Sequence, residues 1–170
     1  MNREMFALIF GAVKQPEIRE TASDFYGGWR LPQEKDLVQA HLVVELMDQW
    51  GYPPGLIHVN YLVGFKNGGE AEEVDVLVMD AKGNARMIFL VEIPENYFPR
   101  RESAIDRLYS ASRVVDSGNL SYLCYYTRWY EKGAMKKRVF AINRGLYPTK
   151  EAWIKAGKPC QSSLWRYQPE

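Results

Sequence analysis

The chain has 170 residues, of which 46% are hydrophobic, so we expect one folded domain with a substantial core and exclude a disordered chain. The longest apolar run near the start, residues 5–10, is too short to cross a bilayer, and Cys124 and Cys160 give neither a disulfide framework nor metal-ligand spacing. These features predict a cytoplasmic protein that does not associate with membranes.

The net charge is only +1, but the two halves of the chain differ in sign. Residues 1–96 hold 8 Lys/Arg and 15 Asp/Glu, a balance of −7, whereas residues 97–170 hold 14 and 6, a balance of +8. A basic half of this kind favours an anionic partner such as nucleic acid. The alternative is that the two halves attract each other once the chain has folded.

The first element that the pattern defines is a helix. Residues 1–31 show no clear period and are interpreted as an N-terminal extension, with a loop at Gly27-Gly28. From Pro32 to Trp50, apolar residues recur at spacings of three and four, which predicts an amphipathic helix that ends before Gly51.

The period then becomes that of strands and alternates with further helices. Three strands are predicted, at residues 57–65, 74–79 and 87–93. A helix over 101–116, strands at 120–127 and 139–142, and a short helix over 150–156 follow. This order predicts an α/β fold, a central mixed β-sheet flanked by helices, that occupies residues 32–159 and leaves 160–170 as a C-terminal tail.

Asp75 and Glu92 lie at one end of the second and third predicted strands. If these strands form a hairpin closed symmetrically about Gly83-Asn84, the two residues lie directly opposite each other, with Cβ atoms roughly 5 Å apart, and the hairpin is central in the sheet. Two carboxylates so close repel each other, and a hard divalent cation, commonly Mg²⁺, would relieve that repulsion. The alternative is that each carboxylate meets a lysine or arginine, or solvent.

The strings VDVLV at 74–78 and IFLVE at 88–92 resemble the core of the PD-(D/E)XK nucleases. More narrowly, the chain resembles the N-terminal nuclease domain of type I restriction enzyme R subunits over roughly residues 31–159. The motifs that extend the resemblance are LPQE at 31–34, Gln39, GYP at 51–53, Leu56-Ile57, Tyr147-Pro148, Trp153 and Gly157.

The resemblance implies a restriction-endonuclease-like sandwich in which Asp75 and Glu92 hold Mg²⁺, which orients a water and stabilises charge on the scissile phosphate. The lysine that completes the family's motif is replaced by Pro94, which is also expected to deform the strand that carries Glu92. Asn60 stands where the family often has a glutamate in its first strand.

A second family motif, Gln-X-X-X-Tyr, is also missing, since Arg107 and Ala111 stand at its positions. Three residues are candidates to replace the missing lysine: Lys66 on the neighbouring strand, Arg107 on the following helix, and Glu95, which could turn inward if Pro94 forms a bulge.

Two groups of cations are candidates for contact with nucleic acid. Arg100 and Arg101 follow the carboxylate pair, and the basic residues Lys136, Lys137 and Arg138 follow an aromatic-rich segment at 122–130. Aromatic rings beside cations suit base stacking and phosphate contact. The alternative for the second group is a core strand followed by a solvated charged hairpin.

The function expected from the sequence is DNA binding on a nuclease fold, with weak phosphodiester hydrolysis or none. Two alternatives stay open: a non-catalytic module that binds protein or scaffolds an assembly, and an active Mg²⁺-dependent DNA endonuclease with a relocated cation. The expected partners are DNA and, by the resemblance, other subunits of a restriction-modification complex.

Overall fold

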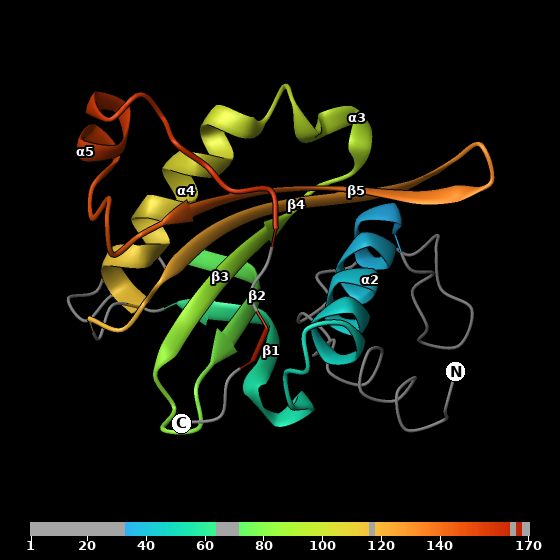
Figure 1. Cartoon of the computed structure of the whole chain (residues 1–170), viewed down its shortest axis with the longest axis horizontal. Coiled ribbons are helices and arrows are strands. Elements are labelled where there is room, and N and C mark those ends of the chain that lie inside the picture. Colours follow the sequence, from blue (N-terminus) through green and yellow to red (C-terminus); the bar gives the residue numbers. More distant parts are fainter. Residues whose placement is uncertain (1–32, 64–71, 116–117, 164–165, 168–170) are drawn as a thin grey trace, which may run out of the picture.

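The structure is a computed structural model, and it describes residues 33–63, 72–115, 118–163 and 166–167. It is an α/β fold with a five-stranded mixed open sheet and helices on both faces (Figure 1). The strands are β1 (Ile57–Val63), β2 (Glu72–Met79), β3 (Ala85–Val91), β4 (Tyr122–Glu131) and β5 (Ala134–Asn143). The helices are α2 (Glu34–Asp48), the 3-10 turn η1 (Pro54–Leu56), α3 (Pro94–Tyr97), α4 (Arg101–Val115) and α5 (Lys150–Lys155).

The strands follow one another in the sheet in chain order, β1-β2-β3-β4-β5. Neighbours are antiparallel except β3 and β4, which are parallel and are connected through α3 and α4. The β2–β3 hairpin therefore lies inside the sheet, as its apolar sequence predicts, because both faces of these strands are covered.

Two hydrophobic cores lie on opposite faces of the sheet. On one face α2 buries Leu42 and Leu46 against β-strand residues such as Val76 and Phe89. On the other face α4 packs with α5, which contributes the buried ring of Trp153. Figure 1 shows this arrangement, with α2 on one side of the strands and α3, α4 and α5 on the other.

The helix predicted from Pro32 to Trp50 is confirmed as α2, slightly shorter at each end. It begins where the Asp36 carboxylate accepts a hydrogen bond from the backbone N–H of Gln33, at 2.7 Å, which satisfies one of the donors exposed at a helix start. Two acidic residues in the first turn, Glu34 and Asp36, also suit the positive end of the helix dipole.

The predicted register of the β2–β3 hairpin is wrong by two residues. Val76 pairs with Phe89 and Leu77 with Ile88, so Asp75 and Glu92 are not directly opposite each other. The reason lies in the turn, where the Asp80 carboxylate accepts hydrogen bonds from the backbone N–H groups of Lys82 and Asn84, at 2.9 and 2.8 Å. This turn and an irregularity between Val78 and Met79 move the centre of the hairpin.

β4 continues four residues past its predicted end, and β5 begins five residues before its predicted start. They continue past the core as a two-stranded ribbon, residues 128–138, which we call the arm, and which projects beyond the helices (Figure 1). Its two-residue turn has positive φ at both Lys132 (49°) and Gly133 (79°), the backbone twist that favours tight hairpins. The prediction ended β4 early and began β5 late because exposed polar residues dominate this part.

Two segments were predicted to flank the domain, and the structure describes part of the C-terminal one. The N-terminal extension, residues 1–31, lies outside the described residues. The expected tail partly joins the fold, because Gln161 forms an antiparallel bridge to Ala141 and the Tyr167 ring lies 5.4 Å from the Tyr52 ring. Among the described residues, no helix has the length and apolar character needed to span a membrane.

Candidate functional site

Asp75 lies on β2 with only 7% of its surface exposed. Lys35 of α2 donates to its Oδ1 at 2.6 Å, and the backbone N–H of Val91 on β3 donates to its Oδ2 at 2.6 Å. The carboxylate is thereby held between a helix and the neighbouring strand. Charge-assisted hydrogen bonds of this kind are the stronger ones in proteins, so the side chain is well fixed.

Two amides support Asp75 from the side of β1 and α2. Gln39 Nε2 donates to the Asp75 backbone carbonyl at 2.5 Å and to Asn60 Oδ1 at 2.8 Å. Asn60 lies between the pairs Val59–Val76 and Tyr61–Val74, and it has a φ of 49°, in the left-handed region within a strand. A non-glycine residue there is strained, and such strain concentrates at functional sites.

Glu92 follows β3 directly, and its backbone N–H continues the strand ladder to the Tyr126 carbonyl at 3.0 Å. Its Oε1 accepts from the backbone N–H of Ile93 at 3.0 Å, and its Oε2 accepts from Arg100 at 3.1 Å. Because Asp75 bonds the backbone of Val91, the residue before Glu92, both carboxylates lie at the same end of the sheet. The alternative in which each carboxylate meets a basic residue is the one observed.

The hydroxyl of Tyr125 is a further polar group of this region. Burial and the carboxylate of Glu92 raise the pKa of Tyr125, with a smaller contribution from Asp75. Its ring stacks on that of Tyr97, with centroids 4.5 Å apart. Its hydroxyl is buried and finds no hydrogen-bond partner among the described residues, so the site retains one polar atom that is not satisfied internally.

The strand predicted over residues 87–93 ends at Val91, so Pro94 lies outside it and the predicted deformation of that strand by Pro94 is not seen. Pro94 begins the short helix α3, where its fixed φ suits the first turn and its missing N–H costs nothing. Glu95 is therefore on an exposed helical turn and forms no inward bulge.

Of the other two candidates to replace the missing lysine, only Arg107 lies among the described residues. Arg107 is exposed on α4 and donates to the Glu73 carbonyl at 3.1 Å. Lys66 lies outside the described residues. The cations that do contact the pair are Lys35 and Arg100, and of these only Arg100 was singled out from the sequence, as a phosphate contact. Lys35 is the first basic residue of the helix whose Gln39 belongs to the family-like motif, and this proximity is the signal that could have found it.

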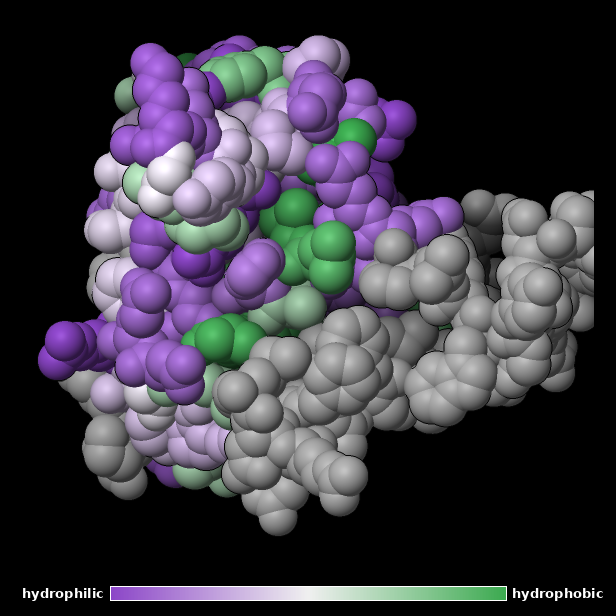
Figure 2. Space-filling model, turned by 90° about the vertical axis from the view of Figure 1, so that its right-hand side faces the viewer, coloured by the Kyte–Doolittle hydropathy of each residue, from purple (hydrophilic) through white to green (hydrophobic). Residues whose placement is uncertain are grey.

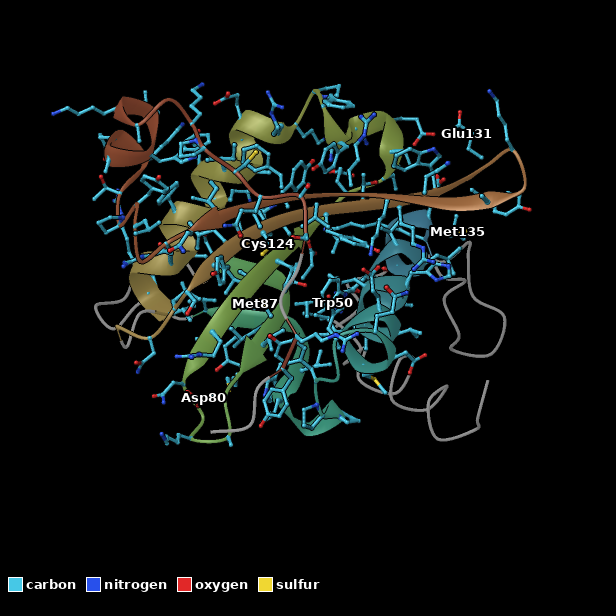
Figure 3. All side chains as sticks on the ribbon, in the orientation of Figure 1. Trp50, Asp80, Met87, Cys124, Glu131 and Met135 are labelled. Carbon is cyan, nitrogen blue, oxygen red and sulfur yellow. The ribbon has the colours of Figure 1, made fainter. Side chains whose placement is uncertain are left out.

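The cations expected to contact nucleic acid have diverse partners. Lys137 bonds the buried carboxylate of Glu45, and Arg101 lies 5.7 Å from the Phe140 ring. Arg138 lies over the rings of Phe98 (4.5 Å) and Trp129 (5.5 Å), and Lys136 is exposed on the same face of the arm. Glu131 and Met135 lie near the tip of the arm (Figure 3).

Glu45 is the most enclosed carboxylate of this region, with no side-chain exposure. It accepts hydrogen bonds from the Tyr126 hydroxyl (2.9 Å), the Trp50 indole (3.1 Å) and Lys137, and Arg128 lies 3.7 Å away. Burial and this carboxylate raise the pKa of Tyr126. The cluster fixes α2 to β4 and β5, a structural role that the sequence did not indicate.

A magnesium ion at this site would share the carboxylates of Asp75 and Glu92 with the chain's own donors. Each of their four oxygens accepts one hydrogen bond from the chain itself. Within the described ranges, no cluster of three or more His, Cys, Asp or Glu residues could hold a metal. A cation at this site would compete with Lys35 and Arg100 for these oxygens. A separate recess of about 550 Å³ at the other end of the sheet contains none of the predicted site residues.

No protein-family model matches the chain, and no curated protein is similar to it.

Proposed function

We propose that the protein is a DNA-binding domain on a restriction-endonuclease-like fold, similar to the N-terminal domain of type I restriction R subunits, and that it hydrolyses phosphodiesters weakly or not at all. The observation that carries this proposal is the charge arrangement at one end of the sheet. Basic side chains of the chain neutralise both carboxylates, and a further cation, Arg138 of the arm, lies over the ring of Phe98, two residues before Arg100.

The arm supports the DNA-binding part of the proposal. Residues 128–138 contain five basic residues and one acidic residue, a balance of +4, of which Glu45 offsets one charge. A two-stranded ribbon is narrow enough to enter the major groove of duplex DNA. Figure 2 views the molecule from the side toward which the arm projects, and hydrophilic residues border a small hydrophobic area there.

The proposal is tested by fluorescence anisotropy with a labelled duplex over a series of salt concentrations. We expect weak binding that falls steeply with salt, because phosphate contacts release counterions. Absence of binding even at low salt would contradict it and would favour the protein-interaction module. Incubation of the protein with supercoiled plasmid and Mg²⁺ or Mn²⁺ tests hydrolysis, for which we expect little or no nicking.

A second candidate is an active nuclease, and Lys35 is the observation that favours it. Its ammonium group lies 2.6 Å from Asp75 although it comes from a helix, so it brings a cation to the site that Pro94 cannot supply. If the plasmid is cleaved, this candidate requires that Asp75→Ala and Lys35→Ala each abolish cleavage, whereas Arg107→Ala leaves it unchanged.

A further inference from the structure

We propose that a recess between α3 and the arm binds one phosphate group of the nucleic-acid backbone, with Arg138 and Thr127 as its ligands. This inference rests on the proposed DNA binding and names the place where one phosphate is held. The recess has a volume of about 90 Å³, and its lining residues are Pro94, Tyr97, Phe98, Thr127, Trp129 and Arg138. Since roughly 10–15 Å³ on this measure holds one water, a phosphate group has room.

Arg138 is held in the recess by two aromatic rings. Its guanidinium carbon lies 4.5 Å from the Phe98 ring centre and 5.5 Å from that of Trp129. It makes no hydrogen bond or ion pair with the described residues, so its N–H edges remain available to a ligand. A stacked guanidinium is oriented in advance to bind an oxyanion through two parallel hydrogen bonds.

Thr127 is directly opposite Arg138 in the antiparallel ladder and belongs to the same recess. It is only 1% exposed, yet its hydroxyl has no hydrogen-bond partner among the described residues. A buried polar atom left unpaired is costly, and its retention in a strand centre calls for an explanation. A phosphate oxygen that enters beside Arg138 would accept the hydrogen bond of this hydroxyl.

The recess lies next to the candidate site. Pro94 lines it and is two residues from Glu92, and Phe98 is two residues from Arg100, which bonds Glu92. A phosphate held here would therefore position a strand across the carboxylate end of the sheet. The half-exposed Phe98 ring (56%) and the Trp129 ring give apolar surfaces beside the phosphate, against which a sugar or base can pack.

Three variants of the full chain test the inference by anisotropy with a labelled duplex. Arg138→Lys keeps the charge but loses the planar fork, and we expect roughly tenfold weaker binding. Thr127→Val keeps the shape, and we expect several-fold weaker binding with an unchanged or higher melting temperature, because it removes an unsatisfied hydroxyl. Lys136→Gln is the matched control, since it removes a charge from the same face outside the recess.

The salt dependence of DNA binding distinguishes specific contacts in the recess from nonspecific attraction between charges. A plot of log affinity against log salt has a negative slope. We expect Lys136→Gln to make this slope shallower by about 0.9, as loss of one phosphate contact on duplex DNA does. Thr127→Val and Arg138→Lys are expected to leave that slope nearly unchanged. The inference is overturned if both recess variants bind like the wild type, or if Thr127→Val lowers affinity only together with the melting temperature.

A direct probe keeps the recess testable if DNA binding fails. Nuclear magnetic resonance of the ¹⁵N-labelled protein would follow the Arg138 side-chain N–H and the Thr127 amide during titration with dimethyl phosphate and, separately, inorganic phosphate. Shifts with dimethyl phosphate that Thr127→Val removes support an internal phosphodiester as ligand. Shifts with inorganic phosphate alone support a strand-end phosphate instead. No shift with either probe overturns the recess, whereas shifts without any duplex binding would overturn only the proposed function.

Discussion

Glu45 and Asp75 are both buried carboxylates that meet a lysine, and they differ in how completely the chain encloses them. Glu45 has no side-chain exposure and four neighbouring donors, which come from β4, β5 and the turn that follows α2. Asp75 retains 9% side-chain exposure, and its partner Lys35 is 41% exposed. The lysine partners are exposed to a similar extent (39% for Lys137), so the clusters differ in how many groups hold the carboxylate. Four donors surround Glu45 and fix α2 on the sheet, whereas Lys35 and one backbone N–H hold the carboxylate of Asp75. The contrast separates a structural ion cluster from one that a ligand can enter.

The largest effect is expected when the Glu45 cluster is broken. Glu45→Gln keeps the shape but leaves Arg128 and Lys137 without a counter-charge, and we expect a loss of about 3 kcal/mol in the free energy of unfolding, as for other broken buried pairs. Urea denaturation measures this loss. The double variant Glu45→Gln/Lys137→Met should recover part of it, and a full-size loss in that double variant would argue against the ion-pair explanation.

A smaller stability loss is expected at Asp75. Asp75→Asn retains an acceptor for the Val91 N–H but weakens it and loses the pair with Lys35, so we expect a loss of about 1 kcal/mol in the same urea experiment. The order of the two losses is the test of the comparison. Equal losses for Glu45→Gln and Asp75→Asn would show that both clusters are structural.

The accessible cluster should respond to magnesium when its own cation is removed. Lys35→Met frees one oxygen of Asp75, and we expect Mg²⁺ to bind about fivefold more tightly, because a partly exposed pair contributes up to about 1 kcal/mol. Isothermal titration calorimetry measures the affinity. Lys150→Met, which breaks the ion pair with Asp106 far from the site, is the control. An affinity that does not change in Lys35→Met would show that Lys35 does not compete with a metal.

The smallest effect is expected from His41, which is exposed at the surface of α2 and whose pKa is lowered from 6.5 by partial desolvation and, second, by the nearby charge of Arg128. A lowered pKa means that the folded state binds the proton less well than the unfolded state. Its stability contribution is therefore full above pH 6.5 and falls as the pH drops from 6.5 through the folded pKa. Proton resonances of the ring measure the titration, and Arg128→Gln should raise the pKa part of the way. A pKa at or above 6.5 would contradict this.

The sequence alone predicted the elements that depend on local pattern. The helix now seen as α2, the β2–β3 hairpin inside the sheet and the helix α4 follow from apolar periodicity, which reports which face of an element is buried. The alternation of faces along β2 and β3 also came out correctly, because an error of two residues in register leaves every side chain on its own face. Asp75 and Glu92 were therefore still predicted at one end of the sheet.

The tertiary structure determined the register of the β2–β3 hairpin, the partners of the charged side chains and the length of β4 and β5. The Asp80 turn shifted the hairpin, since a side-chain cap can move a turn without changing the strand pattern. Lys35 and Asp75 are 40 residues apart, and Thr127 faces Arg138 only because β4 and β5 continue as the arm. Such contacts depend on how elements pack, and no period in the sequence encodes which charged side chain reaches which carboxylate.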